Sequence, residues 1–241
     1  MKLSYDLHIH TALSPCASDD MTPNNIVNMS LLKGLDVIAI TDHNSVENCA
    51  ATIKAAENKD IIVIPGMELQ TAEDVHLLCF FEKIEQAFEL QEMVNEKILK
   101  MDNNPSVLGN QHLLNHEDEI IGEKKEMLLI SSGLSLNDAI SRVKSLDGVP
   151  VPAHIDRGHN SLIVNLGFVP ENLNVNLLEI SQQGNLEQLM KVYKNLRQYH
   201  YITNSDAHYL GNISERIRFI EAENKTVKAV IEALKQGGGL H

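Results

Sequence analysis

Short runs of apolar residues recur along the chain and show little polar alternation. Runs rich in Val, Ile and Leu with this pattern are typical of strands that are covered on both faces. The last run is the least regular of the series. We expect strands at residues 3–10, 36–41, 61–69, 75–81, 149–154, 177–181, 201–205 and 217–221.

Longer amphipathic segments with helix start and stop signals lie between these runs. Thr22 followed by Pro23 is typical of a helix start, and Gly34 is typical of a helix end. Ser135 with Asp138 three residues later predicts the start of another helix. We expect helices at residues 24–33, 46–58, 135–148, 185–198 and 226–236.

This alternation of strands and helices predicts an α/β fold. Strand–helix–strand repetition is typical of a parallel sheet with right-handed crossovers, and the number of strands favours a closed or nearly closed barrel. A chain of 241 residues can bury the core of one large domain. We therefore expect a single barrel domain over residues 1–241.

The segment from about residue 83 to residue 134 interrupts the alternation. It is strongly polar and charged, with helical periodicity at 85–101 and a turn-like stretch at 102–109. We expect an insertion, mainly helical, that projects from the barrel and shapes access to a site. His112 and His116 have the i, i+4 spacing of a helical metal site, but the acidic residues beside them favour a solvent-exposed face.

The acidic composition limits the kinds of partner. A formal net charge of −13 and the absence of Trp argue against a nucleic-acid surface, while a small phosphorylated substrate stays compatible because metals supply positive charge locally. The three cysteines are widely spaced and favour a reducing compartment. No apolar run reaches membrane-spanning length and no signal-peptide pattern is present, so we expect a cytoplasmic protein with no membrane partner. The oligomeric state stays open.

Metal-capable side chains lie at the ends of the expected strands or, for His76, within one, and strand ends are where catalytic groups lie in α/β barrels. Near each end of the chain, two of them are separated by one residue and would share a face of an extended strand. A single strand-end histidine is more often a hydrogen-bonded structural residue, so the shared position of the whole set is what predicts a metal site. The set comprises His8, His10, His43, Glu68, His76, His154, Asp206 and His208.

An arginine accompanies this set. Arg157 follows His154 by three residues, and a planar guanidinium suits the oxygens of a phosphate group. The alternative for Arg157 is a surface ion pair with the neighbouring Asp156.

Six short motifs follow one another along the chain. They are Asp6-Leu7-His8-Ile9-His10, Thr41-Asp42-His43, Gly66-Met67-Glu68, Val75-His76, Ala153-His154 and Ser205-Asp206-Ala207-His208. In this order they resemble the motifs of the polymerase and histidinol phosphatase (PHP) superfamily, and residues 83–134 lie outside the match. The resemblance implies a distorted (βα)7, TIM-like barrel that holds two or three divalent metal ions and hydrolyses phosphoesters.

The resemblance also implies how the ligands divide among the ions. The first metal would take His8, His10, Glu68 and Asp206, the second would share Glu68 and add His76 and His154, and the third would take His43, His208 and a carboxylate from the loop after the first strand. Asp19 fits that last position best, with Asp20 as the rival, while Asp6 and Asp42 would orient neighbouring imidazoles. Mixed imidazole and carboxylate ligands suit zinc, manganese or iron.

These residues predict a hydrolase of phosphoester bonds. A hydroxide bridging the first two metals would attack phosphorus, with Glu68 and His43 at the ions and Arg157 on the phosphate oxygens. We expect the substrate to be a phosphate ester of a small metabolite or a nucleotide. Two alternatives stay open: a nuclease or exonuclease of the PHP type, and a degenerate barrel that binds metal without catalysis.

Overall fold

The computed structural model describes residues 1–171 and 173–240, and most of its strands belong to one sheet. The strands are β1 (Lys2–Ile9), β2 (Val37–Ile40), β3 (Ile62–Gln70), β4 (His76–Phe80), β5 (His112–Leu114), β6 (Ile120–Glu123), β7 (Val149–Pro152), β8 (Leu177–Glu179), β9 (His200–Ile202), β10 (Phe219–Glu221) and β11 (Gly239–Leu240). Seven of them form a sheet in the order β11–β10–β1–β2–β3–β4–β7. The hairpin β5–β6 and the parallel pair β8–β9 are separate.

The sheet is only partly parallel. β1, β2 and β3 are parallel, as the repetition of strands and helices predicts, but β4 runs antiparallel to both of its neighbours, β3 and β7. The expectation of an all-parallel sheet is wrong at this strand and at β10, which runs antiparallel to β1 and to β11. Only five residues separate β3 from β4, whereas a parallel connection needs about a dozen or more.

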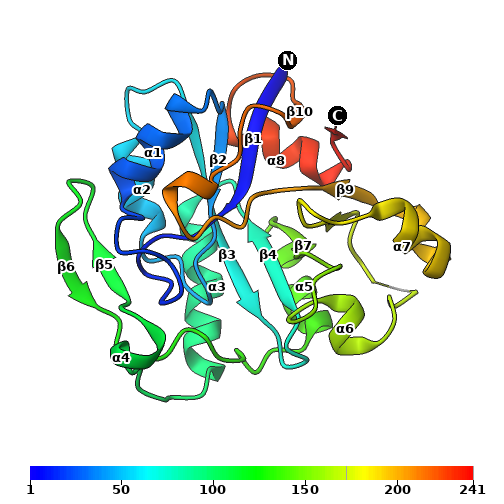
Figure 1. Cartoon of the computed structure of the whole chain (residues 1–241), viewed down its shortest axis with the longest axis horizontal. Coiled ribbons are helices and arrows are strands. Elements are labelled where there is room, and N and C mark those ends of the chain that lie inside the picture. The colour runs from blue at the N-terminus through cyan, green and yellow to red at the C-terminus, as the bar shows by residue number, and fades with distance from the viewer. Residues whose placement is uncertain (172, 241) are drawn as a thin grey trace.

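The sheet curls, and the pair β8–β9 connects its β7 edge back to β1. Ile155 N–H donates to Glu179 O (3.0 Å), which joins the end of β7 to β8. After β9, Ala207 N–H donates to His8 O (3.1 Å), which joins this part of the chain to β1. The protein is therefore a mixed α/β fold with a curled sheet, in which the two extremes of the chain lie side by side (Figure 1).

Helices cover this sheet (Figure 1). They are α1 (Pro23–Leu32), α2 (Cys49–Ala55), α3 (Ile84–Lys97), α4 (Pro105–Leu108), α5 (Leu136–Ser145), α6 (Leu162–Leu166), α7 (Leu186–Val192) and α8 (Val227–Lys235), with 3-10 turns η1 (Lys194–Gln198) and η2 (Leu210–Asn212). The expected start of α5 is confirmed, because Ser135 Oγ accepts a hydrogen bond from Asp138 N–H (3.2 Å). The helix expected at 185–198 is divided into α7 and η1 at Tyr193. None of the described helices is long and apolar enough to cross a membrane.

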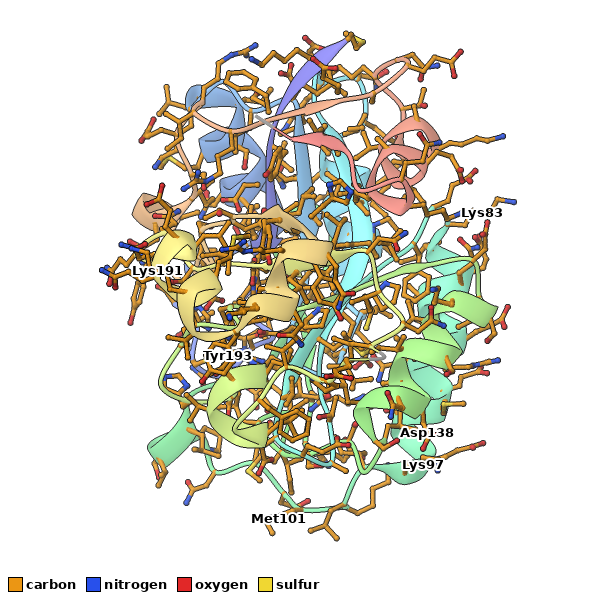
Figure 2. All side chains as sticks on the ribbon, turned by 90° about the vertical axis from the view of Figure 1, so that its right-hand side faces the viewer. Lys83, Lys97, Met101, Asp138, Lys191 and Tyr193 are labelled. Carbon is orange, nitrogen blue, oxygen red and sulfur yellow. The ribbon has the colours of Figure 1, made fainter. Side chains whose placement is uncertain are left out.

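The apolar core has two parts, one on each face of the strands. The larger part joins the sheet to α1, α2, α3 and α5, and the smaller part joins the other face to α8 through Val230, Ile231 and Leu234. In the side view, α3 and α5 lie alongside each other, and Gln86 of α3 donates to Leu146 O just after α5 (2.8 Å; Figure 2). Burial on both faces explains why the strand sequences show little alternation.

The polar segment at 83–134 is only partly the projecting insertion that was expected. α3 belongs to the helix layer, because Ala87, Leu90 and Val94 are fully buried against the core. The projecting part is the hairpin β5–β6, which lies at the edge of the molecule (Figure 1). His112 lies on β5 and His116 in the turn after it, so the helical pairing considered for these two histidines is wrong.

Candidate metal centre

Segments from the two extremes of the chain meet at the centre of the site. β1 carries His8, and His10 follows directly after its last residue. The segment after β9 forms a parallel bridge to this end of β1, and His10 N–H donates to Ala207 O (3.0 Å). This pairing brings Asp206 and His208 next to the two histidines, as the spacing of the motifs predicts.

Glu68 lies at the middle of the histidines. Its carboxylate is 1% exposed, and Oε1 lies 2.8 Å from His76 Nδ1, 3.1 Å from His154 Nε2 and 3.2 Å from His8 Nε2. His76 reaches Glu68 from the start of β4, not from the end of a strand. Because β4 is antiparallel, its first residue lies at the same edge of the sheet as the end of β3.

The second oxygen of Glu68 faces two further imidazoles. Oε2 lies 2.9 Å from His43 Nδ1 and 3.3 Å from His10 Nε2. His43 follows β2 and forms a parallel bridge with Glu68, so the adjacent parallel strands place both groups at one level. One carboxylate therefore contacts five imidazole rings, with ligand atoms facing each of its two oxygens.

Asp206 completes one side of the cluster. Its Oδ1 lies 3.1 Å from both His8 Nε2 and His10 Nε2, and its Oδ2 pairs with the Arg157 guanidinium. Asp156, the alternative partner of Arg157, instead accepts hydrogen bonds from the backbone N–H and the hydroxyl of Ser181 (2.8 and 2.5 Å). The surface ion pair considered for Arg157 is therefore not the one that forms.

Two of the cluster residues have a left-handed backbone. The φ angle is +26° at His154 and +53° at Asp206. A residue with a side chain in this region costs about 1–3 kcal/mol and persists only where its surroundings fix it. His154 N–H donates to the buried Glu179 Oε2 (2.8 Å), which fixes the first of them.

The donor atoms fit divalent metal ions. Among the described residues, three groups place their ligand atoms within 4.8 Å of one another: His8, His10, Glu68 and Asp206; His10, His43 and His208; and His43, Glu68 and His76. Several buried atoms of these side chains have no hydrogen-bond partner in the described part of the chain: His8 Nε2, His43 Nδ1, Glu68 Oε2, His76 Nε2 and His154 Nδ1. Buried polar atoms without a partner are rare, and metal coordination would satisfy those that face the cluster, such as His8 Nε2, His43 Nδ1 and Glu68 Oε2.

The electrostatics also favour cations. Burial raises the pKa of Glu68, but the imidazoles of His76, His8 and His43 outweigh this effect and hold the pKa well below its usual value. Burial lowers the pKa of His43 to about 3 and that of His208 to about 4. Burial also lowers the pKa of His8 and His10, but neighbouring carboxylates, Asp206 first, outweigh it and raise the pKa of His10 to about 9 and that of His8 well above its usual value. At neutral pH the centre therefore combines ionised carboxylates with neutral His43 and His208 and protonated His8 and His10, whose protons a metal ion would displace.

Glu179 is a site residue that the sequence analysis missed. It is 2% exposed, and both of its oxygens lie 3.1 Å from His8 Nδ1. Asn204 Nδ2 donates to Oε1 (2.7 Å). A carboxylate on Nδ1 fixes the histidine tautomer in which Nε2 is free to bind a metal. The signal in the sequence was a charged residue inside the apolar run Leu177-Leu178-Glu179-Ile180.

Asp42 and Asp6 support the cluster in different ways. Asp42 accepts a hydrogen bond from Ser14 Oγ (2.7 Å), and Ser14 Oγ lies 3.0 Å from His10 Nδ1, so the carboxylate orients the imidazole through a hydroxyl. Asp6 has no imidazole partner among the described residues. It accepts hydrogen bonds from the backbone N–H and the hydroxyl of Ser205 (3.0 and 2.6 Å), which positions the residue before Asp206.

The structure brings eight of the nine expected metal ligands together and places the ninth elsewhere. Asp19 points to solvent with 62% of its side chain exposed. It accepts from Asn110 Nδ2 (3.1 Å), just before the hairpin, and lies 3.5 Å from Nε2 of His112, the first residue of β5. No described group of candidate ligands includes Asp19 or Asp20, and the group around the expected third ion contains His10 beside His43 and His208.

A curled α/β sheet with a buried cluster of imidazoles and carboxylates at its edge defines a class of metal-binding domain. The chain belongs to the PHP domain family, whose model matches residues 6–236. An uncharacterized protein of Methanocaldococcus jannaschii is 35% identical over 78 residues, which cover 28% of this chain and 44% of that protein.

Several solved structures share the fold. The lesion-specific endonuclease Q of Pyrococcus furiosus has a TM-score of 0.74 and 20% identity, covering 100% of this chain and 57% of that chain. A complex of endonuclease Q with a 27-mer duplex that carries an abasic lesion has a TM-score of 0.69, 21% identity and coverage of 100% and 58%. A putative metal-dependent phosphoesterase of Bifidobacterium adolescentis has a TM-score of 0.59, 17% identity and coverage of 97% and 96%. The chain thus spans little more than half of the endonuclease and nearly the whole of the phosphoesterase.

Proposed function

We propose that this protein is a metal-dependent phosphoesterase that hydrolyses a phosphate ester of a small metabolite or a nucleotide. The observation that carries the proposal is Glu68, a buried carboxylate whose two oxygens contact five imidazoles. Membership of the PHP family and the similarity to a putative phosphoesterase over nearly its whole length support the same class of reaction.

The proposed ligand sets are those that the family resemblance implies, and the first of them coincides with a group of described ligand atoms that lie within 4.8 Å of one another. His8, His10, Glu68 and Asp206 would hold one ion; Glu68, His76 and His154 would hold a second; and His43 with His208 would hold a third. Zinc, manganese or iron suits these ligands, and such ions supply an activated water and neutralise phosphate charge. Asp19 as a ligand of the third ion stays a prediction that requires its side chain to leave Asn110 and His112.

The chain's own residues would orient the substrate. Arg157 donates one N–H group to Asp206, and 34% of its side chain is exposed. Its remaining N–H donors are therefore available to a ligand beside the cluster. A guanidinium there would hold the non-bridging oxygens of a phosphate group and stabilise the charge that develops on them. His43, buried and neutral at physiological pH, would act as a ligand rather than as a proton donor.

The test compares Glu68→Gln with wild type for metal content by elemental analysis and for phosphate release from p-nitrophenyl phosphate with manganese or zinc. We expect both to be lost together. Glu92→Gln is the matched control, because Glu92 is an exposed carboxylate on α3. Circular dichroism reports whether the variant is folded. Full activity in Glu68→Gln would exclude the bridging role.

Endonuclease activity is the second candidate, and the high TM-score with endonuclease Q over the whole chain favours it. The net charge of −13 argues against it, because a nucleic-acid-binding surface needs a basic face. Incubation of the metal-loaded protein with a labelled duplex that carries one abasic site decides between them. Cleavage of the duplex without phosphate release from monoesters would favour the nuclease.

A further inference from the structure

A polar cavity of about 450 Å³ lies directly beside the metal centre. The loops that follow β7, β8 and β9 form its walls, so it opens at the same edge of the sheet as the histidine cluster. Arg157 and Ser205 line it, and both adjoin Asp206, the first by an ion pair and the second in sequence. The volume falls within the range of small-molecule sites, about 300–1,000 Å³.

The hydrogen-bonding groups on the cavity wall have free capacity. The Ser205 and Ser181 hydroxyls donate their protons to Asp6 and Asp156, so their lone pairs are available as acceptors. Gln182 donates weakly to Ser214 Oγ (3.3 Å) and retains its carbonyl oxygen. The amide of Gln183 makes no hydrogen bond with the described part of the chain and offers both donors and acceptors.

The composition of the wall selects the kind of ligand. The residues that line the cavity are Asp156, Arg157, Gly158, Ser181, Gln182, Gln183 and Ser205. None of the described residues that line it is an aromatic on which a base could stack or an aliphatic that would receive an apolar group. Acceptor hydroxyls beside amides suit a neutral group that carries several hydroxyls.

We propose that this cavity binds a sugar or another hydroxyl-rich alcohol attached to the phosphate that lies at the metal centre. The inference rests on the proposed phosphoesterase function and names its substrate class. Arg157 joins the two subsites, because its guanidinium contacts Asp206 of the cluster and also lines the cavity. The sugar could belong to a free sugar phosphate or to a nucleic-acid strand, and the same chemistry would recognise both.

Two substitutions change the cavity without touching the cluster. A Cβ atom added at Gly158 meets nothing within 4 Å, so Gly158→Phe should fill the cavity without backbone strain. Gln183→Ala removes the free amide. The controls are Gly122→Phe on the hairpin, where the nearest atom lies at 3.6 Å, and Gln188→Ala on the exposed face of α7.

The experiment measures kcat/KM of the manganese-loaded enzymes for ribose 5-phosphate, glucose 6-phosphate and p-nitrophenyl phosphate. We expect Gln183→Ala to lower the ratio of sugar phosphate to aryl phosphate activity about threefold to tenfold, mainly through KM, and Gly158→Phe to lower it more. Ratios within twofold of wild type in both variants would overturn the proposal. An abasic duplex as substrate tests whether the sugar belongs to a nucleic-acid strand rather than to a free sugar phosphate. If it belongs to a strand, the same variants should reduce cleavage of the duplex.

Direct binding separates the cavity from the chemistry. If wild type hydrolyses none of these esters, the proposed function fails, and saturation-transfer NMR with ribose 5-phosphate then tests the cavity alone. Signals at least threefold weaker in Gly158→Phe than in Gly122→Phe would support the sugar subsite. Equal signals in the two variants would refute it.

Discussion

Replacing Glu179 with glutamine should weaken metal binding although Glu179 reaches the ions only through a histidine. Its Oε1 accepts from Asn204 Nδ2 (2.7 Å), its Oε2 accepts from His154 N–H (2.8 Å), and His8 Nδ1 lies 3.1 Å from both. An amide keeps one acceptor oxygen and presents an NH2 group at the other position. In either orientation that NH2 group faces an N–H donor.

The NH2 group also lies beside His8 Nδ1, and it can donate to that nitrogen only if His8 gives up its Nδ1 proton. The ring proton then moves to Nε2, the atom that faces Glu68 Oε1 (3.2 Å) and Asp206 Oδ1 (3.1 Å) and that would bind the metal. The variant must therefore lose a buried hydrogen bond to a charged group, worth about 1.5–3 kcal/mol, or an imidazole ligand. Loss of such a supporting carboxylate typically lowers metal affinity about 10- to 100-fold.

Competition with a fluorescent chelator measures this affinity for zinc in wild type, Glu179→Gln and the exposed control Glu187→Gln on α7. We expect the loss in Glu179→Gln alone, and thermal unfolding of the metal-free proteins shows separately how much stability changes. Zinc affinity within twofold of wild type in a folded Glu179→Gln protein would refute the argument from the tautomer of His8.

Three further predictions concern stability. Gly148→Ala should lower the free energy of unfolding by about 1–3 kcal/mol in urea, because the added Cβ would lie 2.6 Å from Phe81 Cε1, whereas Gly122→Ala should change it little. Burial raises the pKa of Asp36, but hydrogen bonds from Ser4 and Lys225 outweigh it and hold the pKa below its usual 3.8. The unfolded chain therefore binds a proton first as the pH falls, so the stabilisation is complete above about pH 5 and is lost as the pH falls through the folded pKa. The melting-temperature difference between wild type and Asp36→Asn should be constant above about pH 5 and shrink as the pH falls from there to about pH 3, and a difference that stays constant over this range would contradict this. Removing metal with a chelator should lower the melting temperature of wild type but not of Glu68→Gln, because an ion at a hundredfold excess over its Kd stabilises the fold by about 2.7 kcal/mol.

The candidate site was predictable to the extent that it depends on local spacing. His8 with His10, and Asp206 with His208, each share a face of an extended segment, and the apolar runs around them identify those segments. Glu179 was also accessible to this reasoning. A carboxylate within the apolar run at 177–181 is costly unless it has buried partners, and His8 and Asn204 are those partners.

The orientation of Asp19 was not predictable in this way. The side chain belongs to an irregular loop, and its partners Asn110 and His112 lie about ninety residues further along the chain. No periodicity connects a loop residue to a segment so distant, and the register of the hairpin decides which side chains it meets. The prediction of Asp19 came from resemblance alone, and the structure gives this carboxylate different neighbours.

The two corrections to the fold have physical causes that the sequence contains. Five residues between two apolar runs are too few for a helical crossover, so β4 had to be antiparallel, and this reversal is what places His76 beside Glu68. In α3, the spacing of Ala87, Leu90 and Val94 makes a narrow apolar stripe within a mostly polar helix. A stripe of that width is enough to bury one face, so high overall polarity indicates an exposed opposite face and not a helix that projects from the domain. Asn48 Nδ2 donates to both Thr11 Oγ1 (2.9 Å) and His112 O (3.0 Å), so the base of the hairpin β5–β6 is joined to the loop after β1. Within the polar region, the hairpin is therefore the segment to which the prediction of shaping access to the metal centre still applies.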